Sequence, residues 1–174
     1  MHNNKPYTNA TFTKRVDHEA GRHRPPRSAS EPTVCEECGA VYVSRRWTAA
    51  NSAAGTKRHK HWRPPQTTIC PACAQQRTGE PRGFVFLDGA FFVVHDEEIE
   101  HLLRNEAERA AEDNPLARIM ELKRGDGHKL TVTTTTEHLA QRLGGALEKA
   151  FGGNTHYDFS HENKLARVNW QRED

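Results

Sequence analysis

The sequence predicts an α+β protein in which an antiparallel sheet carries helices on one face and a small cysteine-bearing module precedes it. Three observations predict this. The pattern Cys-x-x-Cys occurs twice, at Cys35–Cys38 and Cys70–Cys73. From Gly83 onward, apolar residues follow strand and helix periodicities in turn. Residues 1–33 contain few large apolar side chains, so we expect them to be a flexible tail.

The cysteine-bearing segment, 34–82, is expected to contain two short strands. Residues 41–43 and 67–69 are rich in Val, Tyr, Thr and Ile, which favour strands. Residues 44–66 between them are polar, basic and rich in turn-forming residues. We therefore expect that stretch to project as a loop.

The domain expected over 83–174 begins with an apolar run. Residues 84–87 and 90–93 flank Asp88-Gly89, a favoured two-residue turn, and predict a hairpin; a single bulged strand is the alternative. A helix follows and stops before Pro115. Its apolar residues recur at helical spacing: Ile99, Leu102, Leu103, Ala107, Ala110 and Ala111.

The second half of this domain repeats the pattern. Strands are expected at 118–123 and 129–133, and a helix then begins with a capping box in which Thr134 is the N-cap and Glu137 reaches back. Leu139, Leu143, Leu147 and Phe151 form its buried stripe, and Gly152-Gly153 ends it. Strands at 155–159 and 165–170 complete the chain. This order of elements suits an antiparallel sheet with helices on one face, and a ferredoxin-like fold is one candidate.

The two cysteine pairs point to a metal. Two residues between thiolates allow one turn to present both sulfurs to one ion, and two such turns complete a tetrahedral Zn²⁺ site. Gly39, directly after the first pair, permits the positive φ that closes such a turn. The 31 residues between the pairs exceed the usual ribbon spacing of about 15–20, which fits a zinc ribbon with an inserted basic loop. The expected ligands of a structural Zn²⁺ are Cys35, Cys38, Cys70 and Cys73.

Other uses of the cysteines fit less well. Disulfides between residues three apart are awkward, and a thioredoxin-type redox pair needs a βαβ context that is missing. Four thiolates leave a zinc ion without an open position for substrate, and no thiol remains as a nucleophile. The sequence has no Gly-rich phosphate loop, no HExxH and no deaminase pattern. We therefore expect a protein that is not an enzyme and has no small-molecule substrate.

Charge is distributed unevenly along the chain. Residues 1–82 hold 14 Lys and Arg against 6 Asp and Glu, a net +8, whereas residues 83–174 hold 11 against 17, a net −6. Such asymmetry is typical of a basic arm that binds a polyanion. Cations neutralise phosphates, while Trp and Arg side chains stack on unpaired bases. The expected RNA contacts are Arg22, Arg24 and Arg27 in the tail and Arg45, Arg46, Trp47, Lys57, Arg58, Lys60, Trp62 and Arg63 in the loop. The alternative for Trp47 is that it covers the small zinc core.

Several strings together resemble a known family. Cys35-x-x-Cys38-Gly39, Arg46-Trp47 and Cys70-Pro-x-Cys73 resemble the zinc-ribbon region of the large-ribosomal-subunit export adaptors of archaea and eukaryotes. Small bacterial relatives of that family are similar downstream, at 114–120, 132–135, 138–142 and 167–170. The resemblance covers roughly 34–172. This chain has fewer cysteine pairs and lacks the family's export signals, so nuclear export does not carry over.

The resemblance implies binding to ribosomal RNA of the large subunit near the tRNA sites. We therefore expect a cytoplasmic, ribosome-associated zinc protein that acts in hibernation, assembly or quality control, with ribosomal proteins as further contacts. The alternatives are a zinc-ribbon adaptor that binds a protein, for example in transcription, and a nuclease using His59 and His61. A membrane protein is not expected, since no stretch approaches the roughly 18 consecutive apolar residues of a membrane helix. The N-terminus lacks a secretory signal.

Overall fold

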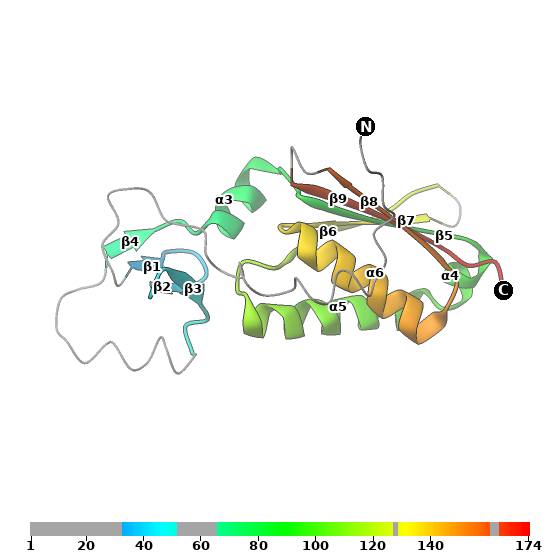
Figure 1. The fold of residues 1–174 in the computed structure, drawn as a ribbon, viewed down its shortest axis with the longest axis horizontal. Coiled ribbons are helices and arrows are strands. Elements are labelled where there is room, and N and C mark those ends of the chain that lie inside the picture. The colour runs from blue at the N-terminus through cyan, green and yellow to red at the C-terminus, as the bar shows by residue number, and fades with distance from the viewer. Residues whose placement is uncertain (1–32, 52–65, 127–128, 161–163) are drawn as a thin grey trace, which may run out of the picture.

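The computed structural model of the chain describes residues 33–51, 66–126, 129–160 and 164–174. Figure 1 shows two parts: a small cysteine module (33–51 and 66–79), whose helix α3 (Pro71–Thr78) lies on the side toward the body, and the larger body (83–174). The expected tail, with Arg22, Arg24 and Arg27, lies outside the described residues, as does the loop segment 52–65. The α+β class is confirmed.

The cysteine module is a four-stranded sheet followed by a helix. Its strands lie in the order β3-β2-β1-β4. Strand β4 pairs parallel with β1, with Cys35 opposite Thr68, so both strands run toward the same edge of the sheet. This pairing brings Cys70 to the edge where Cys35 lies. The bounds are β1 (Thr33–Cys35), β2 (Val41–Val43), β3 (Arg46–Thr48), β4 (Gln66–Thr68) and α3 (Pro71–Thr78).

Two features of the module differ from the expectation. The segment expected to be a projecting loop begins instead with a strand, β3, which pairs with β2 through a tight turn at Ser44 and Arg45. Both turn residues have positive φ (52° and 63°), the backbone twist that suits a two-residue hairpin. The second cysteine pair lies at the start of α3, a helix that was not predicted, and not in a second turn between strands.

The body contains a five-stranded sheet in the order β6-β7-β5-β9-β8. Helix α6 packs on β5, β7, β8 and β9, and α5 packs on α6; Figure 1 shows both helices on the same side of the sheet. The predicted helix over 99–111 and the predicted strands at 118–123, 129–133, 155–159 and 165–170 are all confirmed. The bounds are β5 (Gly83–Asp88), α4 (Ala90–Val94), α5 (Asp96–Asp113), β6 (Ile119–Arg124), β7 (Lys129–Thr134), α6 (Glu137–Phe151), β8 (Asn154–Ser160) and β9 (Leu165–Gln171).

The sheet is mixed, whereas a wholly antiparallel one was expected. Strands β5, β6 and β7 have the order and directions of a ferredoxin-like sheet. Strand β8 is also antiparallel to β5, but β9 turns back from it and inserts between the two, parallel to β5. The final hairpin therefore places one extra strand inside an otherwise ferredoxin-like arrangement.

The hairpin predicted around Asp88-Gly89 is wrong. Strand β5 has β7 on one side and β9 on the other, so a further strand has no free edge to pair with. The chain instead forms the short helix α4 after Gly89, and Phe92 is buried in the core. An apolar run of this length fits either a strand or a helix, which is why periodicity did not separate them.

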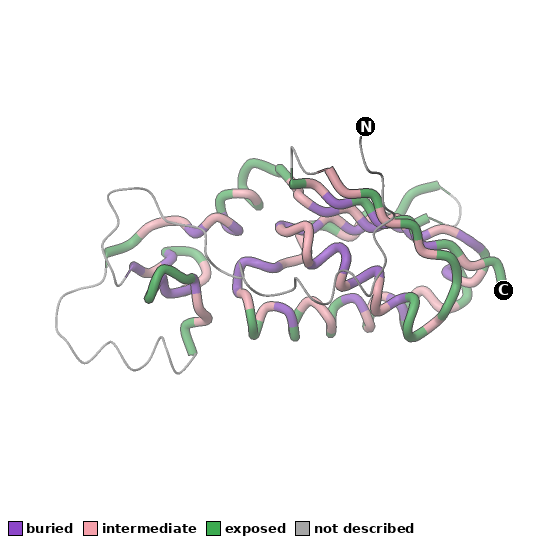
Figure 2. The backbone as a smooth tube through the Cα atoms, viewed as in Figure 1, coloured by how far each residue is buried: buried purple, intermediate pink, exposed green. Residues whose placement is uncertain are grey.

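The body has one main hydrophobic core between the sheet and the helices. Buried positions alternate along β5, β7 and β9, where Figure 2 shows purple segments, and their side chains share one core with those of α6. Leu139, Leu143 and Leu147 are buried as predicted, and Gly152 ends the helix. The N-cap is Thr136 and not Thr134, since the Thr136 hydroxyl accepts from the Leu139 N–H at 3.2 Å. No helix in the described part of the chain is long and apolar enough to cross a membrane.

Candidate metal centre

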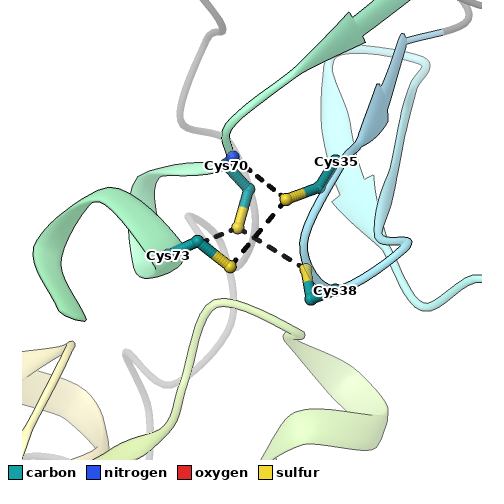
Figure 3. Close-up of side chains that lie close together, drawn as sticks. All are labelled: Cys35, Cys38, Cys70 and Cys73. Carbon is teal, nitrogen blue, oxygen red and sulfur yellow. Dashed lines mark hydrogen bonds between the residues drawn. The ribbon is translucent and has the colours of Figure 1, made fainter. Parts of the chain in front are cut away.

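The first cysteine pair lies in a tight turn after β1. The Cys35 N–H donates to the Ala40 carbonyl at 2.8 Å, and the Gly39 N–H donates to the Cys35 carbonyl at 2.9 Å. Gly39 has a φ of 71°, as predicted, a conformation that costs a side-chain-bearing residue energy. The turn holds Cys35 and Cys38 with both sulfurs toward the second pair (Figure 3).

The second pair begins helix α3. Pro71 occupies the first helical turn, where its missing N–H costs nothing, and the Cys70 sulfur caps the helix by accepting from the Cys73 N–H at 3.4 Å. The Cys70 N–H in turn donates to the Cys35 sulfur at 3.3 Å. Backbone N–H groups at a helix N-terminus therefore point at the sulfur cluster, and they favour negative charge there.

The four sulfurs have the spacing that a tetrahedral zinc ion requires. All lie within 4.8 Å of one another, with Cys35 and Cys73 sulfurs 3.8 Å apart and Cys38 and Cys70 sulfurs 3.7 Å apart. A tetrahedron with Zn–S bonds of about 2.3 Å separates its sulfurs by about 3.8 Å. The cysteines form no disulfide, so all four are available as ligands. The structure thus fits a metal ion held by four thiolates, of which Zn²⁺ is the usual occupant.

The thiols differ in how readily they ionise. Burial opposes ionisation of Cys35, but hydrogen bonds from the backbone N–H groups of Cys38, Cys70 and Glu37 outweigh it and lower its pKa to about 7. Burial raises the pKa of Cys70 to about 11 and raises the pKa of Cys73 well above its ordinary value. A metal ion must therefore displace protons from Cys70 and Cys73 when it binds.

A small hydrophobic core surrounds the sulfurs. Trp47 is 1% exposed and packs against Tyr42, with ring centroids 5.5 Å apart. The indole N–H of Trp47 has no hydrogen-bond partner among the described residues. Leu116, which belongs to the body, completes this core and is also 1% exposed. The core of the module therefore depends on a side chain from the body.

Two charged side chains lie at the site beside the cysteines. Arg118, after α5, donates through Nη1 to the Cys73 sulfur at 3.5 Å. Glu37, inside the first pair, accepts from the Arg77 Nε at 2.5 Å and links the first turn to α3. A hydrogen bond from the Cys73 thiol and the neighbouring Arg77 lower the pKa of the Glu37 carboxyl. Motif spacing in the sequence could not identify Arg118 as part of the site, because it lies 45 residues beyond Cys73.

The predicted RNA contacts are placed as follows. Arg45 and Arg46 lie exposed at the tip of the β2–β3 hairpin. Trp47 was also predicted to contact RNA, and this is contradicted, because its side chain is buried in the module core; the alternative role, covering that core, is confirmed. The remaining loop residues lie outside the described part of the chain: Lys57, Arg58, Lys60, Trp62 and Arg63. His59 and His61, the residues of the nuclease alternative, lie there too.

Comparisons of the chain with models of protein families, with curated proteins and with solved structures found no match. A function must therefore be sought in the chemistry of the site and in the distribution of charge.

Proposed function

We propose that this chain is a structural-zinc protein that binds RNA through its cysteine module and associates with the ribosome. The observation that carries the proposal is the four-cysteine cluster, whose sulfurs have tetrahedral spacing and which holds the cationic β2–β3 hairpin in place. The zinc is structural, because four protein thiolates fill its coordination sphere. It supplies folding energy and no reaction step.

A metal ion is needed here because the module has little core of its own. Eight buried residues of the described chain make up that core, and three of them are the metal ligands Cys35, Cys70 and Cys73. Structural zinc sites contribute about 10–16 kcal/mol in small metal-folded modules. Zinc binding would therefore fix the module and with it the direction of Arg45 and Arg46.

The charge of the sequence supports a polyanionic partner for the N-terminal half of the chain. The net +8 of residues 1–82 contrasts with the net −6 of residues 83–174, and eight acidic residues lie on α5 in the body. The resemblance to export-adaptor relatives directs the proposal to ribosomal RNA of the large subunit near the tRNA sites. A role in hibernation, assembly or quality control follows from occupancy of that surface.

The zinc part of the proposal is tested by metal analysis of the purified protein. We expect one Zn²⁺ per chain, and none in a Cys70→Ser variant, because the remaining three thiolates no longer close the site. A Thr78→Ser variant, which changes an exposed residue of the same helix, is the control and should keep its zinc. Metal-free wild-type protein with unimpaired RNA binding would contradict the proposal.

The RNA part is tested by sedimentation of cell lysate on sucrose gradients. We expect the wild-type chain to travel with ribosomal particles and to be released by high salt, as phosphate contacts predict. A variant with Arg45, Arg46, Lys57, Arg58, Lys60 and Arg63 changed to Ser should remain at the top of the gradient.

The matched control removes six cations from the body instead, with Arg104, Arg109, Lys123, Lys129, Lys149 and Arg167 changed to Ser. It alters net charge equally and should still travel with the particles. If both variants sediment like wild type, the proposed contact surface is wrong. Appearance with ribosomes mainly after starvation would favour hibernation over assembly.

A further inference from the structure

One segment of the body, residues 114–118, reaches into the cysteine module. It connects α5 to β6 and places Leu116 in the module core, beside the metal-ligating cysteines. The same segment is anchored to the body by Thr135, whose hydroxyl donates to the Leu116 carbonyl at 2.5 Å and accepts from the Arg118 N–H at 2.8 Å. The segment is therefore held from both sides.

Arg118 makes a polar contact between this segment and a metal-ligating cysteine. Its Nη1 donates to the Cys73 sulfur at 3.5 Å, while its Nε donates to the Pro115 carbonyl at 2.8 Å. The bond to the Pro115 carbonyl fixes the plane of the guanidinium and so directs Nη1 toward the Cys73 sulfur. Four thiolates around a divalent cation carry a net charge of −2, and a half-buried cation offsets part of it.

A pocket lies beside this contact between the two parts. A cavity of about 310 Å³ lies between Cys38 and Ala40 of the module and Ala111 and Pro115 of the body, and Arg118 lines it as well. A second polar link crosses from α3: with its amide nitrogen toward the carbonyl, the Gln75 side chain donates to Thr135 O at 3.1 Å. Leu116, Arg118 and Gln75 thus link the two parts beside this pocket.

We propose that Arg118 is a positioning residue of the metal centre, through which metal binding fixes the cysteine module on the body. The inference rests on the zinc site of the proposed function and not on RNA binding. Arg118 holds the Cys73 thiolate in its ligating position, and the metal, by holding Cys73, keeps residues 114–118 docked. Loss of either partner releases the other.

The first test is zinc affinity, measured by competition with a chromophoric chelator. Second-sphere partners of metal ligands typically contribute 10–100-fold, so we expect Arg118→Gln to weaken Zn²⁺ binding by about that factor. Arg118→Lys keeps the charge but cannot bond both Cys73 and Pro115, and should recover part of the loss. The control is Arg142→Gln, which breaks a bond to Glu106 within the body and should leave affinity unchanged.

The absorption of bound Co²⁺ gives a readout that general destabilisation does not move. We expect the thiolate bands of Co²⁺ to shift in Arg118→Gln and to stay in place in Arg142→Gln. Unchanged zinc affinity and an unchanged Co²⁺ spectrum in Arg118→Gln would overturn the inference alone. Failure of the wild-type chain to bind either metal would overturn the zinc site and this inference together.

The second test is hydrogen exchange with and without a zinc chelator. The two amides that attach this segment to the rest of the body are hydrogen-bonded: the Arg118 N–H donates to the Thr135 hydroxyl at 2.8 Å, and the Thr135 N–H donates to the Arg118 carbonyl at 3.0 Å. Removal of zinc should speed exchange at 114–118 and at Thr135 while leaving Val85 and Val168 in the body core protected. Equal exchange rates at 114–118 with and without the chelator would overturn the proposed coupling between metal binding and docking of this segment.

Discussion

At the scale of single residues, the cysteines are the part of the site with the clearest chemistry. Three of the sulfurs are perturbed: backbone N–H groups outweigh burial and lower the pKa of Cys35, while burial dominates at Cys70 and Cys73 and raises the pKa of both. A metal ion converts this uneven set into four thiolates. The metal therefore competes directly with protons.

Zinc affinity should consequently fall as pH falls. The pKa of Cys70, about 11, and the raised pKa of Cys73 mean that both are protonated at pH 7 in the metal-free chain. Binding should release about two protons or more from the cluster. Calorimetric titrations in buffers of different ionisation enthalpy measure that number directly, and zero protons released at pH 7 would contradict the ionisation states described here.

Trp47 lies in a basic stretch of the sequence, yet its side chain packs in the core of the cysteine module. Trp47→Ala should destabilise the cysteine module by about 3–5 kcal/mol, because a large buried side chain is lost. Trp47→Phe keeps most of the buried aromatic volume of the core and removes an N–H that has no partner among the described residues. RNA affinity should be unchanged, because the substituted side chain is buried. Fluorescence anisotropy with a labelled RNA makes the comparison, with Arg45→Ser/Arg46→Ser as the variant that should bind more weakly. A strong loss in Trp47→Phe would mean that the indole is reachable by RNA.

At the scale of elements, helix α6 approaches the sheet closely at Gly144. A Cβ placed on that residue would lie 2.5 Å from Val168 Cγ1 and 3.1 Å from Tyr157 Cε1. Gly144→Ala should therefore destabilise the body, with an overpacking cost of about 1–3 kcal/mol only partly offset by about 1 kcal/mol of helix propensity. Urea unfolding followed by circular dichroism measures the difference. A variant as stable as wild type would show that α6 can move away at no cost.

The start of α5 is tied to β6 by an ion pair. Arg124 donates to Asp96 at 2.8 Å and to Glu100 at 2.5 Å. The Arg124 hydrogen bond holds the pKa of the Asp96 carboxyl below its ordinary value. Because the pKa of Asp96 is lower in the folded chain than in the unfolded chain, the ionised carboxylate stabilises the fold at pH values above the unfolded-state pKa. That stabilisation is lost as the pH falls through the folded-state pKa.

An NMR titration of the Asp96 carboxyl tests that ion pair. In Arg124→Gln its pKa should rise back toward the ordinary value. In Arg104→Gln it should not change, because Arg104 pairs with Glu100 on the same helix and not with Asp96. A low pKa that persists without Arg124 would assign the effect to the helix N-terminus instead.

At the scale of the whole molecule, two cores of unequal size share one chain. Among the described residues, sixteen buried hydrophobic side chains form the body core and eight form the core of the cysteine module. We expect the body to keep its fold without a metal, whereas the smaller core of the module contains three of the cysteines and includes Leu116 of the body. The two parts should therefore respond differently to loss of zinc.

Chelation should unfold the cysteine module and leave the body folded. In hydrogen exchange the amides of β1, β2 and β3 should lose protection, while those of β5 and β9 keep theirs. Calorimetry should then show one transition for the chelated protein, from the body, with its temperature little changed. Loss of protection throughout β5 would mean that the body also requires the metal.

Much of this protein follows from local sequence. Two Cys-x-x-Cys pairs predict four thiols able to hold one metal, and the structure gathers these thiols; the stripe Leu139–Leu143–Leu147 predicts a helix that the structure contains. The helix and the turn at the first cysteine pair are predicted correctly because each depends on residues within a few positions of one another, whereas the meeting of the two pairs depends on the pairing of β1 with β4. A turn, a cap or an amphipathic face is decided at that range.

Only the tertiary structure decided the features that join distant segments. The burial of Trp47, the insertion of β9 parallel to β5 and the approach of Arg118 to Cys73 all depend on which surfaces meet after folding. The local sequence around Asp88-Gly89 is compatible with a hairpin. The hairpin does not form because β5 is already paired with β7 on one side and with β9 on the other. The physical reason is the same throughout. Sequence periodicity predicts which face of a helix or strand is buried, whereas only tertiary packing determines which other element covers that face.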